Sequence, residues 1–277
     1  MRLIGGEIRK LARRPAAYVT LGIQLAIVAL IYLAIGLRYG QGVVGTGGEG
    51  DAGRLGMRML LTFPTAYGGA LGLVTGLGGL LALAFGGAAA GADWGWGMVK
   101  VAVARGESRT RYILSKLLAV EVFVALGFVI AFAIAVGAAF AAASYAGLPT
   151  SGVTDAETLG KLPEQLARGF LGMAEQTAIG FAIATVARSQ LAGLGAGIAL
   201  YFVEQFATIF LADIIKYFPF HVAQSSLQLT VAGAGAGGAN ALTAPLDPNL
   251  SLALVAGYLV AAALVAVAFV ERAEISG

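Results

Sequence analysis

Two glutamates lie inside long apolar runs of the chain, and each is followed directly by a glutamine: Glu175-Gln176 and Glu204-Gln205. A carboxylate is costly in hydrocarbon, so such side chains face a helix-bundle interior, a partner or a water-filled cavity. If the two runs form a helical hairpin, both acids lie at a similar depth. The four side chains could then line one pocket that holds a cationic group or exchanges a proton. The alternative is two protonated acids, each hydrogen-bonded separately to a neighbouring helix.

Other residues with chemical potential are few. A third acid, Glu121, lies near the start of another apolar run, where we expect a structural contact with Lys116 or with the N-terminal segment. His221 is the single histidine, and no metal-ligand spacing surrounds it, so we expect a structural role. With no cysteine either, the chain lacks the nucleophile and base, or the metal cluster, of a membrane-embedded hydrolase. The segment Gly160-Lys161-Leu162 lacks the flanking residues of a phosphate-binding loop. We therefore expect no catalytic residue and no metal site.

Basic residues concentrate in the segment 93–116, which separates two apolar runs. The five are Lys100, Arg105, Arg109, Arg111 and Lys116. This segment must lie in water on one side of a membrane. Within it, Met98, Val101, Ala102 and Arg105 fall on one face of a helix. That pattern predicts a short helix lying along the membrane surface or against a partner.

Composition sets the class of protein. Hydrophobic residues make up 58% of the 277 positions and charged residues 12%, where ~45–50% and ~25% are usual in soluble domains. Apolar runs long enough to span a bilayer occur at Ala16–Leu37, Gly68–Ala92, Leu117–Ala146, Leu166–Ala187, Gln190–Leu211 and Leu250–Val270. Only Arg188 and Ser189 separate the fourth run from the fifth, which predicts a tight hairpin. We expect one all-α integral membrane domain over 1–277, with six transmembrane helices.

The positions of Lys and Arg predict the orientation. One basic cluster precedes the first run and the other is the segment 93–116, so both fall on the same side of the membrane. Short cytoplasmic segments attract positive residues, so we expect both termini in the cytoplasm. The first run is too long, and too heavily preceded by Arg and Lys, for a cleavable signal peptide.

Three flanking segments have their own patterns. Residues 1–15 place Leu3, Ile4, Ile8 and Leu11 at helical spacing before Pro15, which predicts an interfacial elbow helix. An ordinary positively charged flank would explain the charges but not this apolar stripe. The stretch 54–63 is typical of a short interfacial helix. The apolar interval 212–249, interrupted by Pro219, predicts a broken re-entrant helix, with a surface lid as the alternative.

Glycines recur at every fourth residue in two runs, at Gly68, Gly72 and Gly76 and again at Gly193 and Gly197. Such spacing allows helices to approach closely. The contact can be made within the chain or between two copies.

The segment 93–116 resembles the cytoplasmic link between the second and third spans of permeases in the type-2 ATP-binding-cassette (ABC) exporter family. The resemblance rests on the spacing of Asp93, Gly97, Ser108-Arg109 and Lys116. The chain departs from the family at Met98, where Thr or Ser is usual, and at Gly106, where Pro is usual; its acid is Asp rather than Glu. With the elbow helix, six spans and cytoplasmic termini, the resemblance covers nearly the whole chain.

The resemblance implies a function and partners. In such exporters the link is a coupling helix that docks on a separate ATPase, so Asp93, Gly97, Ser108, Arg109 and Lys116 would couple the chain to that subunit. Two copies of the permease, as a homodimer in contact mainly through the first and fifth spans, would join two ATPase subunits. ATP and Mg would bind those partners, leaving this chain with no cofactor. Membrane lipid is expected as a partner and nucleic acid is not. The location implied is a prokaryotic cytoplasmic (inner) membrane.

Two other functions stay open. A secondary carrier would explain the buried carboxylates, but it would not need the pattern from Asp93 to Lys116, and six spans without inverted repeats are few for a carrier. A membrane assembly component without transport activity is the other alternative. The exporters that the chain resembles carry lipids, peptides, antibiotics or ions.

Overall fold

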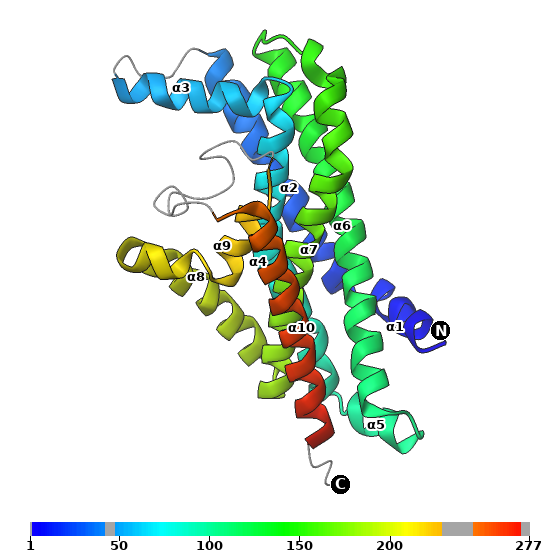
Figure 1. The fold of residues 1–277 in the computed structure, drawn as a ribbon. Helices are drawn as coiled ribbons and strands as arrows, with labels where there is room; N and C mark the ends of the chain where they lie inside the picture. Colours follow the sequence, from blue (N-terminus) through cyan, green and yellow to red (C-terminus); the bar gives the residue numbers. More distant parts are fainter. Residues whose placement is uncertain (1, 42–47, 229–245, 273–277) are drawn as a thin grey trace.

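The computed structural model describes residues 2–41, 48–228 and 246–272, which form helices with no strand among them (Figure 1). Six helices are long and apolar enough to cross a membrane. They are α2 (Pro15–Gly40), α4 (Thr65–Gly95), α6 (Arg109–Tyr145), α7 (Ala156–Ala187), α8 (Gln190–Ile215) and α10 (Pro248–Arg272). The shorter elements are α1 (Arg2–Ala12), α3 (Gly48–Leu61), α5 (Met98–Ala104), the 3-10 helix η1 (Ser151–Thr154) and α9 (Pro219–Ser225). The all-α class and the six spanning helices are confirmed.

Two of the long helices begin well before the apolar run that predicted them. Helix α6 begins at Arg109 because the side chain of Ser108 accepts a hydrogen bond from the Arg111 amide at 3.3 Å. Helix α7 begins at Ala156, where Asp155 accepts from the Thr158 amide at 2.9 Å. Such caps satisfy amide groups that a helix start leaves without partners. The apolar run therefore marks the hydrocarbon thickness, and the cap marks where the helix starts.

Helix α4 packs against α7 along much of its length (Figure 1). Glycines set how closely these two backbones approach. A methyl group at Gly86 would lie 2.3 Å from the Thr177 carbonyl oxygen, and one at Gly180 would lie 2.0 Å from that of Leu83. Only glycine fits at such positions, so backbone packs directly on backbone.

The glycines of α8 also pack within the chain. A methyl group at Gly193 would lie 2.4 Å from Ala184 Cβ, and one at Gly197 would lie 2.0 Å from Leu83 Cδ2. The opposite face of α8 is exposed, and Phe210 on it is 82% accessible. If a second copy contacts the fifth span, it meets this aromatic face and not the glycines.

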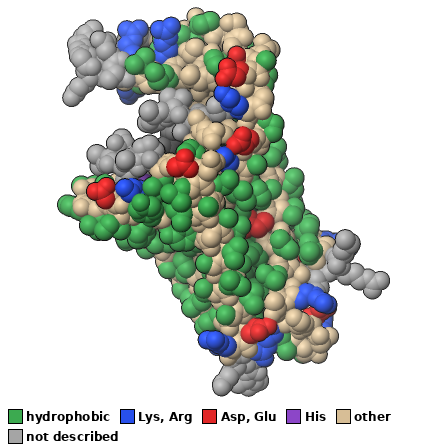
Figure 2. Space-filling model, in the orientation of Figure 1, with side chains coloured by type: hydrophobic (Ala, Val, Ile, Leu, Met, Phe, Trp, Pro, Cys, Tyr) green, Lys and Arg blue, Asp and Glu red, His purple; other side chains and the backbone are tan. Residues whose placement is uncertain are grey.

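The bundle has two ends. Helices α1 and α5 lie at the same end as the last turn of α10, which we call the α5 end; α3 lies at the other, the α3 end (Figure 1). Figure 2 shows hydrophobic side chains over the middle of the molecule and charged side chains mainly toward the ends. This distribution suits a multi-pass membrane protein.

The predicted flanking helices are present as helices. Helix α1 ends at Ala12, shortly before Pro15, and its Leu11 is buried in the main hydrophobic core. Helix α3 covers most of the stretch expected at 54–63. Their placement at a membrane interface stays a prediction.

The break expected around Pro219 is also present. Leu211 has non-helical backbone angles near the end of α8, and after a turn the chain starts α9 at Pro219. Most of α9 is buried, from Pro219 to Ala223, and it packs against α7 and α10. The rest of the interval 212–249 lies partly outside the described residues.

Candidate functional site

A group of charged side chains is buried at the α5 end, and we call it the α5-end ion cluster. Its members are Glu7, Arg14, Asp93, Tyr112 and Lys116. Asp93 is 3% exposed and Lys116 1%. Lys116 forms an ion pair with Asp93, and its Nζ lies 3.7 Å from Glu7 Oε2. Arg14 Nη2 lies 3.4 Å from Asp93 Oδ1, and the Tyr112 hydroxyl donates to Asp93.

The cluster joins elements that are far apart in the sequence. Asp93 lies in the last turns of α4, Lys116 and Tyr112 in α6, Glu7 in α1, and Arg14 directly before α2. Lys10 also pairs with Glu7 at its outer edge. Buried charges are tolerated when they are paired and hydrogen-bonded, and losing one partner is strongly destabilising. The cluster therefore holds the N-terminal helix and the first three long helices as one body.

This placement changes the meaning of two expected coupling residues. Asp93 and Lys116 are both buried, and they form an ion pair with each other, a contact that their spacing did not predict. Neither can touch a soluble partner directly while this pair is intact. Their contribution to coupling would be to connect α5 with the long helices.

Helix α5 lies between two glycines with left-handed backbone angles, Gly97 (φ +65°) and Gly106 (φ +81°). These angles suit glycine and allow the chain to turn sharply on each side of the helix. Val99 is buried in a hydrophobic cluster that includes residues of α4, α6, α7 and α10, whereas Val101 is 40% exposed and Arg105 is exposed. The face of Met98, Val101, Ala102 and Arg105 is therefore partly exposed, and its contact with a membrane surface or a partner stays a prediction.

The other two expected coupling residues lie at the start of α6. Ser108 is exposed and caps α6. Arg109 Nη1 donates to the carbonyl oxygens of Val270 at 3.3 Å and Glu271 at 3.0 Å, and Thr110 hydrogen-bonds to the Glu271 carboxylate. A basic side chain at the last carbonyls of a helix is stabilising. Arg109 thereby ties the start of α6 to the end of α10.

Two tryptophans beside the cluster hold arginines. The Arg14 guanidinium lies 4.6 Å from the Trp96 ring centre, and that of Arg188 lies 5.2 Å from Trp94 and 5.3 Å from Phe269. These are cation–π distances. Arg188 forms the turn between α7 and α8, so the hairpin of these two helices is anchored at the same end. The Trp-Gly-Trp motif next to a basic segment was the signal that could have indicated this contact.

A second polar group surrounds α9, and we call it the α9 cluster: Glu175, Glu204, Thr208 and His221. Glu204 Oε1 accepts the backbone amide of His221 at 2.8 Å and lies 2.8 Å from His221 Nδ1. The other ring nitrogen, Nε2, lies 3.2 Å from Thr208 Oγ1. All four side chains are buried. His221 therefore does more than fill space in the core, because its ring contacts the carboxyl group of Glu204.

Glu175 completes the cluster from α7. It is 0% exposed, and neither of its carboxyl oxygens has a hydrogen-bond partner among the described residues; the same holds for Glu204 Oε2. Glu175 and Glu204 are close enough to interact electrostatically. The two acids thus share one site, as their depth on a hairpin suggested.

The glutamines behave differently from the acids. Gln176 is buried with its amide oxygen against α4, where a methyl group at Gly79 would lie 1.7 Å from it. Gln205 is half-buried. The residue that contacts Glu204 is His221 and not a glutamine, which the sequence pattern did not indicate. A histidine next to Pro219 in an apolar stretch was the available signal.

Polar contacts fix the chain that follows α9 to α7. Arg168 is buried in α7, and its guanidinium donates to Glu164 Oε1, the Ser226 and Pro248 carbonyls and Asn249 Oδ1. Gln165 Oε1 accepts the Gln228 amide at 2.7 Å. The end of α9 and the start of α10 are therefore anchored at the same two residues.

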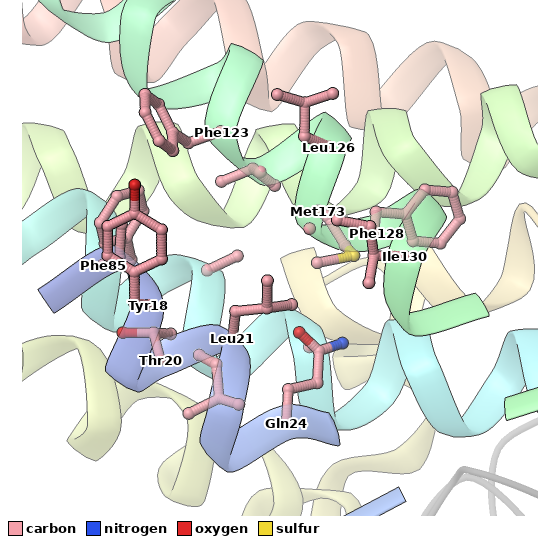
Figure 3. A pocket seen from close by; sticks show the side chains of 16 residues that line it. Tyr18, Thr20, Leu21, Gln24, Phe85, Phe123, Leu126, Phe128, Ile130 and Met173 are labelled. Atoms are coloured by element: carbon pink, nitrogen blue, oxygen red, sulfur yellow. The ribbon is translucent and has the colours of Figure 1, made fainter. Parts of the chain in front are cut away.

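A cavity of about 200 Å³ lies between α2, α4, α6 and α7. Figure 3 shows side chains of α2 and α6, with Met173 of α7, around it. Its lining is almost wholly apolar; Gln24 is buried there and donates to the Val74 carbonyl at 3.2 Å. Tyr18 and Leu126 at its edge are largely exposed. Such a lining suits a hydrocarbon chain.

Glu121 does not make the contact expected of it. Its two carboxyl oxygens are buried without a hydrogen-bond partner among the described residues, and Lys116 pairs with Asp93 and Glu7 instead. Within the same residues, no three acidic or histidine side chains are grouped closely enough to hold a metal ion.

The structure thus defines a multi-pass helical membrane protein with two buried polar clusters and one apolar cavity. Residues 73–276 match the family described as protein of unknown function (DUF2705), and the chain belongs to this family. The match covers all of the α9 cluster and the part of the α5-end ion cluster that lies in α4 and α6. No curated protein matches the chain.

Proposed function

We propose that the chain is the membrane-spanning subunit of an ABC transporter of the exporter type. It would form the translocation pathway and be driven by separate ATPase subunits that bind ATP and Mg. The observation that supports this most is the α5-end ion cluster. It ties α4 and α6, the two helices that precede and follow α5 in the chain, to each other and to α1 and the start of α2, as a device that passes motion from a soluble partner on α5 to the membrane helices requires.

The contacts suggest how force would travel. A partner docked on α5 would meet Val101 and Arg105, which are exposed. Val99 beneath them is packed on α6 and would resist tilting of α5 by itself. The ion pair from Asp93 to Lys116 would then move α4 with α6, and Arg109 would move the end of α10 with the start of α6.

We also propose an orientation, roles for the flanking helices and an assembly. The α5 end would face the cytoplasm with both termini, α1 would be an interfacial elbow, and α9 would be the buried part of a re-entrant segment. Two copies would assemble as a homodimer with two ATPases in a prokaryotic inner membrane. The chain itself would supply no catalytic residue.

The test is assembly with a P-loop ATPase, to be sought first in the reading frames adjacent to the one that encodes this chain. Val101→Glu and Arg105→Glu change exposed positions of α5 and its C-terminal end and leave the ion cluster intact. We expect both variants to insert normally but to lose most co-purifying ATPase and most substrate-stimulated ATP hydrolysis, because the docking surface changes in polarity or charge. Arg111→Glu, also exposed but on α6, is the matched control. Normal assembly and turnover in both variants would refute the coupling role of α5.

A secondary carrier is the second candidate, because the α9 cluster buries two acids beside a histidine. Transport by the purified chain alone in liposomes, driven by a proton gradient without ATP, would favour it over the exporter.

A further inference from the structure

The hydrogen bonds around His221 set the number of protons in the α9 cluster. The Thr208 hydroxyl donates to the Glu204 carbonyl oxygen at 2.8 Å. A hydroxyl group has a single hydrogen. While that bond is made, Thr208 Oγ1 can only accept from His221 Nε2, so Nε2 carries a proton.

The other ring nitrogen must share a second proton with Glu204. His221 Nδ1 and Glu204 Oε1 are 2.8 Å apart, and two lone pairs that close would repel. The pair is therefore either an imidazolium beside a carboxylate or a neutral imidazole beside a carboxylic acid. Both forms have zero net charge. Removing one proton would leave the pair with a charge of −1 and would force the Thr208 hydroxyl to leave its carbonyl and donate to Nε2.

The surroundings make that negative form unfavourable. Glu175 is a second carboxyl group without a described partner, and Tyr201 of α8 and Tyr258 of α10 are the other titratable groups that interact with the acids. Helix α4 contains no Asp, Glu, Lys, Arg or His between Thr65 and Ala92.

The basic side chains nearest in sequence are engaged elsewhere. Arg168 binds Glu164 and the chain that follows α9, and Lys216 Nζ lies 3.6 Å from Asp213 Oδ1. An unbalanced charge in a dry site carries a large desolvation cost.

We infer that Glu204 and His221, with Glu175 beside them, form a proton-binding site whose bound proton holds α9 in place. The proton comes from water and returns to water, and the charge of the Glu204–His221 pair changes from −1 to zero on binding. The proton matters for α9 because Glu204 holds both the backbone and the ring of His221. This site goes beyond the proposed transporter function and does not depend on an ATPase.

The absence of native cysteine permits a direct test on the purified chain in lipid nanodiscs. Ser226→Cys places one thiol at the buried C-terminal end of α9, with little change in size. Its maleimide labelling is measured against pH and divided by that of Ser151→Cys, an exposed position, to remove the effect of thiol ionisation. We expect the corrected rate to rise several-fold with pH as the proton leaves and α9 loosens.

Three second-site variants sharpen the test. Glu204→Gln should abolish the corrected pH dependence. Glu175→Gln should keep it, because neither carboxyl oxygen of Glu175 has a described hydrogen-bond partner. Glu121→Gln changes another acid whose carboxyl oxygens are buried without a described partner and should have no effect.

Infrared difference spectroscopy of the cysteine-free chain gives a second readout that does not require α9 to move. A carboxylic-acid or imidazolium band should titrate in the wild type and be lost or shifted in Glu204→Gln. Two results together would overturn the inference: corrected labelling that does not depend on pH, and no titrating band that depends on Glu204 or His221. Carboxylates that stay ionised around an organic cation would also overturn it.

Discussion

The α5-end ion cluster and the α9 cluster each bury two carboxylates, but among the residues that the structure describes only the first has strong bases within reach. Glu7 and Asp93 face Lys10, Arg14 and Lys116. Glu175 and Glu204 face, among the described residues, a single histidine. Both clusters lie in a chain where charged residues are scarce.

The difference shows that burial alone does not define the role of an acid. Where fixed cations are present, the acids pair with them and act as structural links between helices. Where the available base is an imidazole, the charge balance depends on a proton that can be exchanged. The first cluster suits transmission of force, and the second suits a site that responds to pH.

The largest expected effect is in membrane topology, that is, which end of the bundle faces the cytoplasm and which faces the outside. Ser108→Cys lies at the α5 end and Ser151→Cys at the α3 end, and both positions are exposed. We expect Ser151→Cys to react with an impermeant maleimide in intact cells and Ser108→Cys only after permeabilisation. The reverse pattern would place the ion cluster outside and remove its coupling function.

Breaking the ion cluster should have the next largest effect. Lys116→Met leaves Asp93 and Glu7 without their most buried cation, which should lower the free energy of unfolding by about 3–5 kcal/mol. Thermal unfolding in detergent measures the loss. Adding Asp93→Asn should recover part of it, because one uncompensated charge disappears. An unchanged melting temperature in Lys116→Met would show that the cluster does not hold the helices together.

The smallest effect is expected in the α9 cluster. Glu175→Gln replaces an acid without a described partner by a neutral group of the same size, so the free energy of unfolding should change by less than about 1 kcal/mol. The matched variant Asp93→Asn removes the partner of Lys116 and should destabilise by about 3 kcal/mol or more. Thermal unfolding measures both variants. Equal losses of unfolding free energy in the two would show that the clusters do not differ in this way.

Much of the fold could be predicted because it follows from local composition and from the solvent. Apolar runs located six spanning helices, and a two-residue gap predicted the hairpin of α7 and α8. The equal depth of the two acids on that hairpin was enough to predict that Glu175 lies near Glu204. The helix starts at Arg109 and Ala156 were missed because capping by Ser108 and Asp155, not hydropathy, determines them.

The site was predictable only where one helix, or one hairpin, decides the geometry. Spacing along the chain identified Asp93 and Lys116 but could not show that they bind each other inside the bundle. The buried face of α5 depends on packing against α6, and the partner of His221 depends on how α9 folds back on α8. A lone histidine gives no pattern from which such a partner could be inferred.

The sequence by itself determined the solvent of each segment: which stretches enter hydrocarbon, which stay in water, and where chain reversals occur. Those choices are made residue by residue through hydrophobic transfer and charge. Only the tertiary structure decided which charges neutralise each other. Coulomb interactions between buried groups depend steeply on distance and exposure to water, and long-range packing alone sets both for Lys116 beside Asp93 and for Glu204 beside His221.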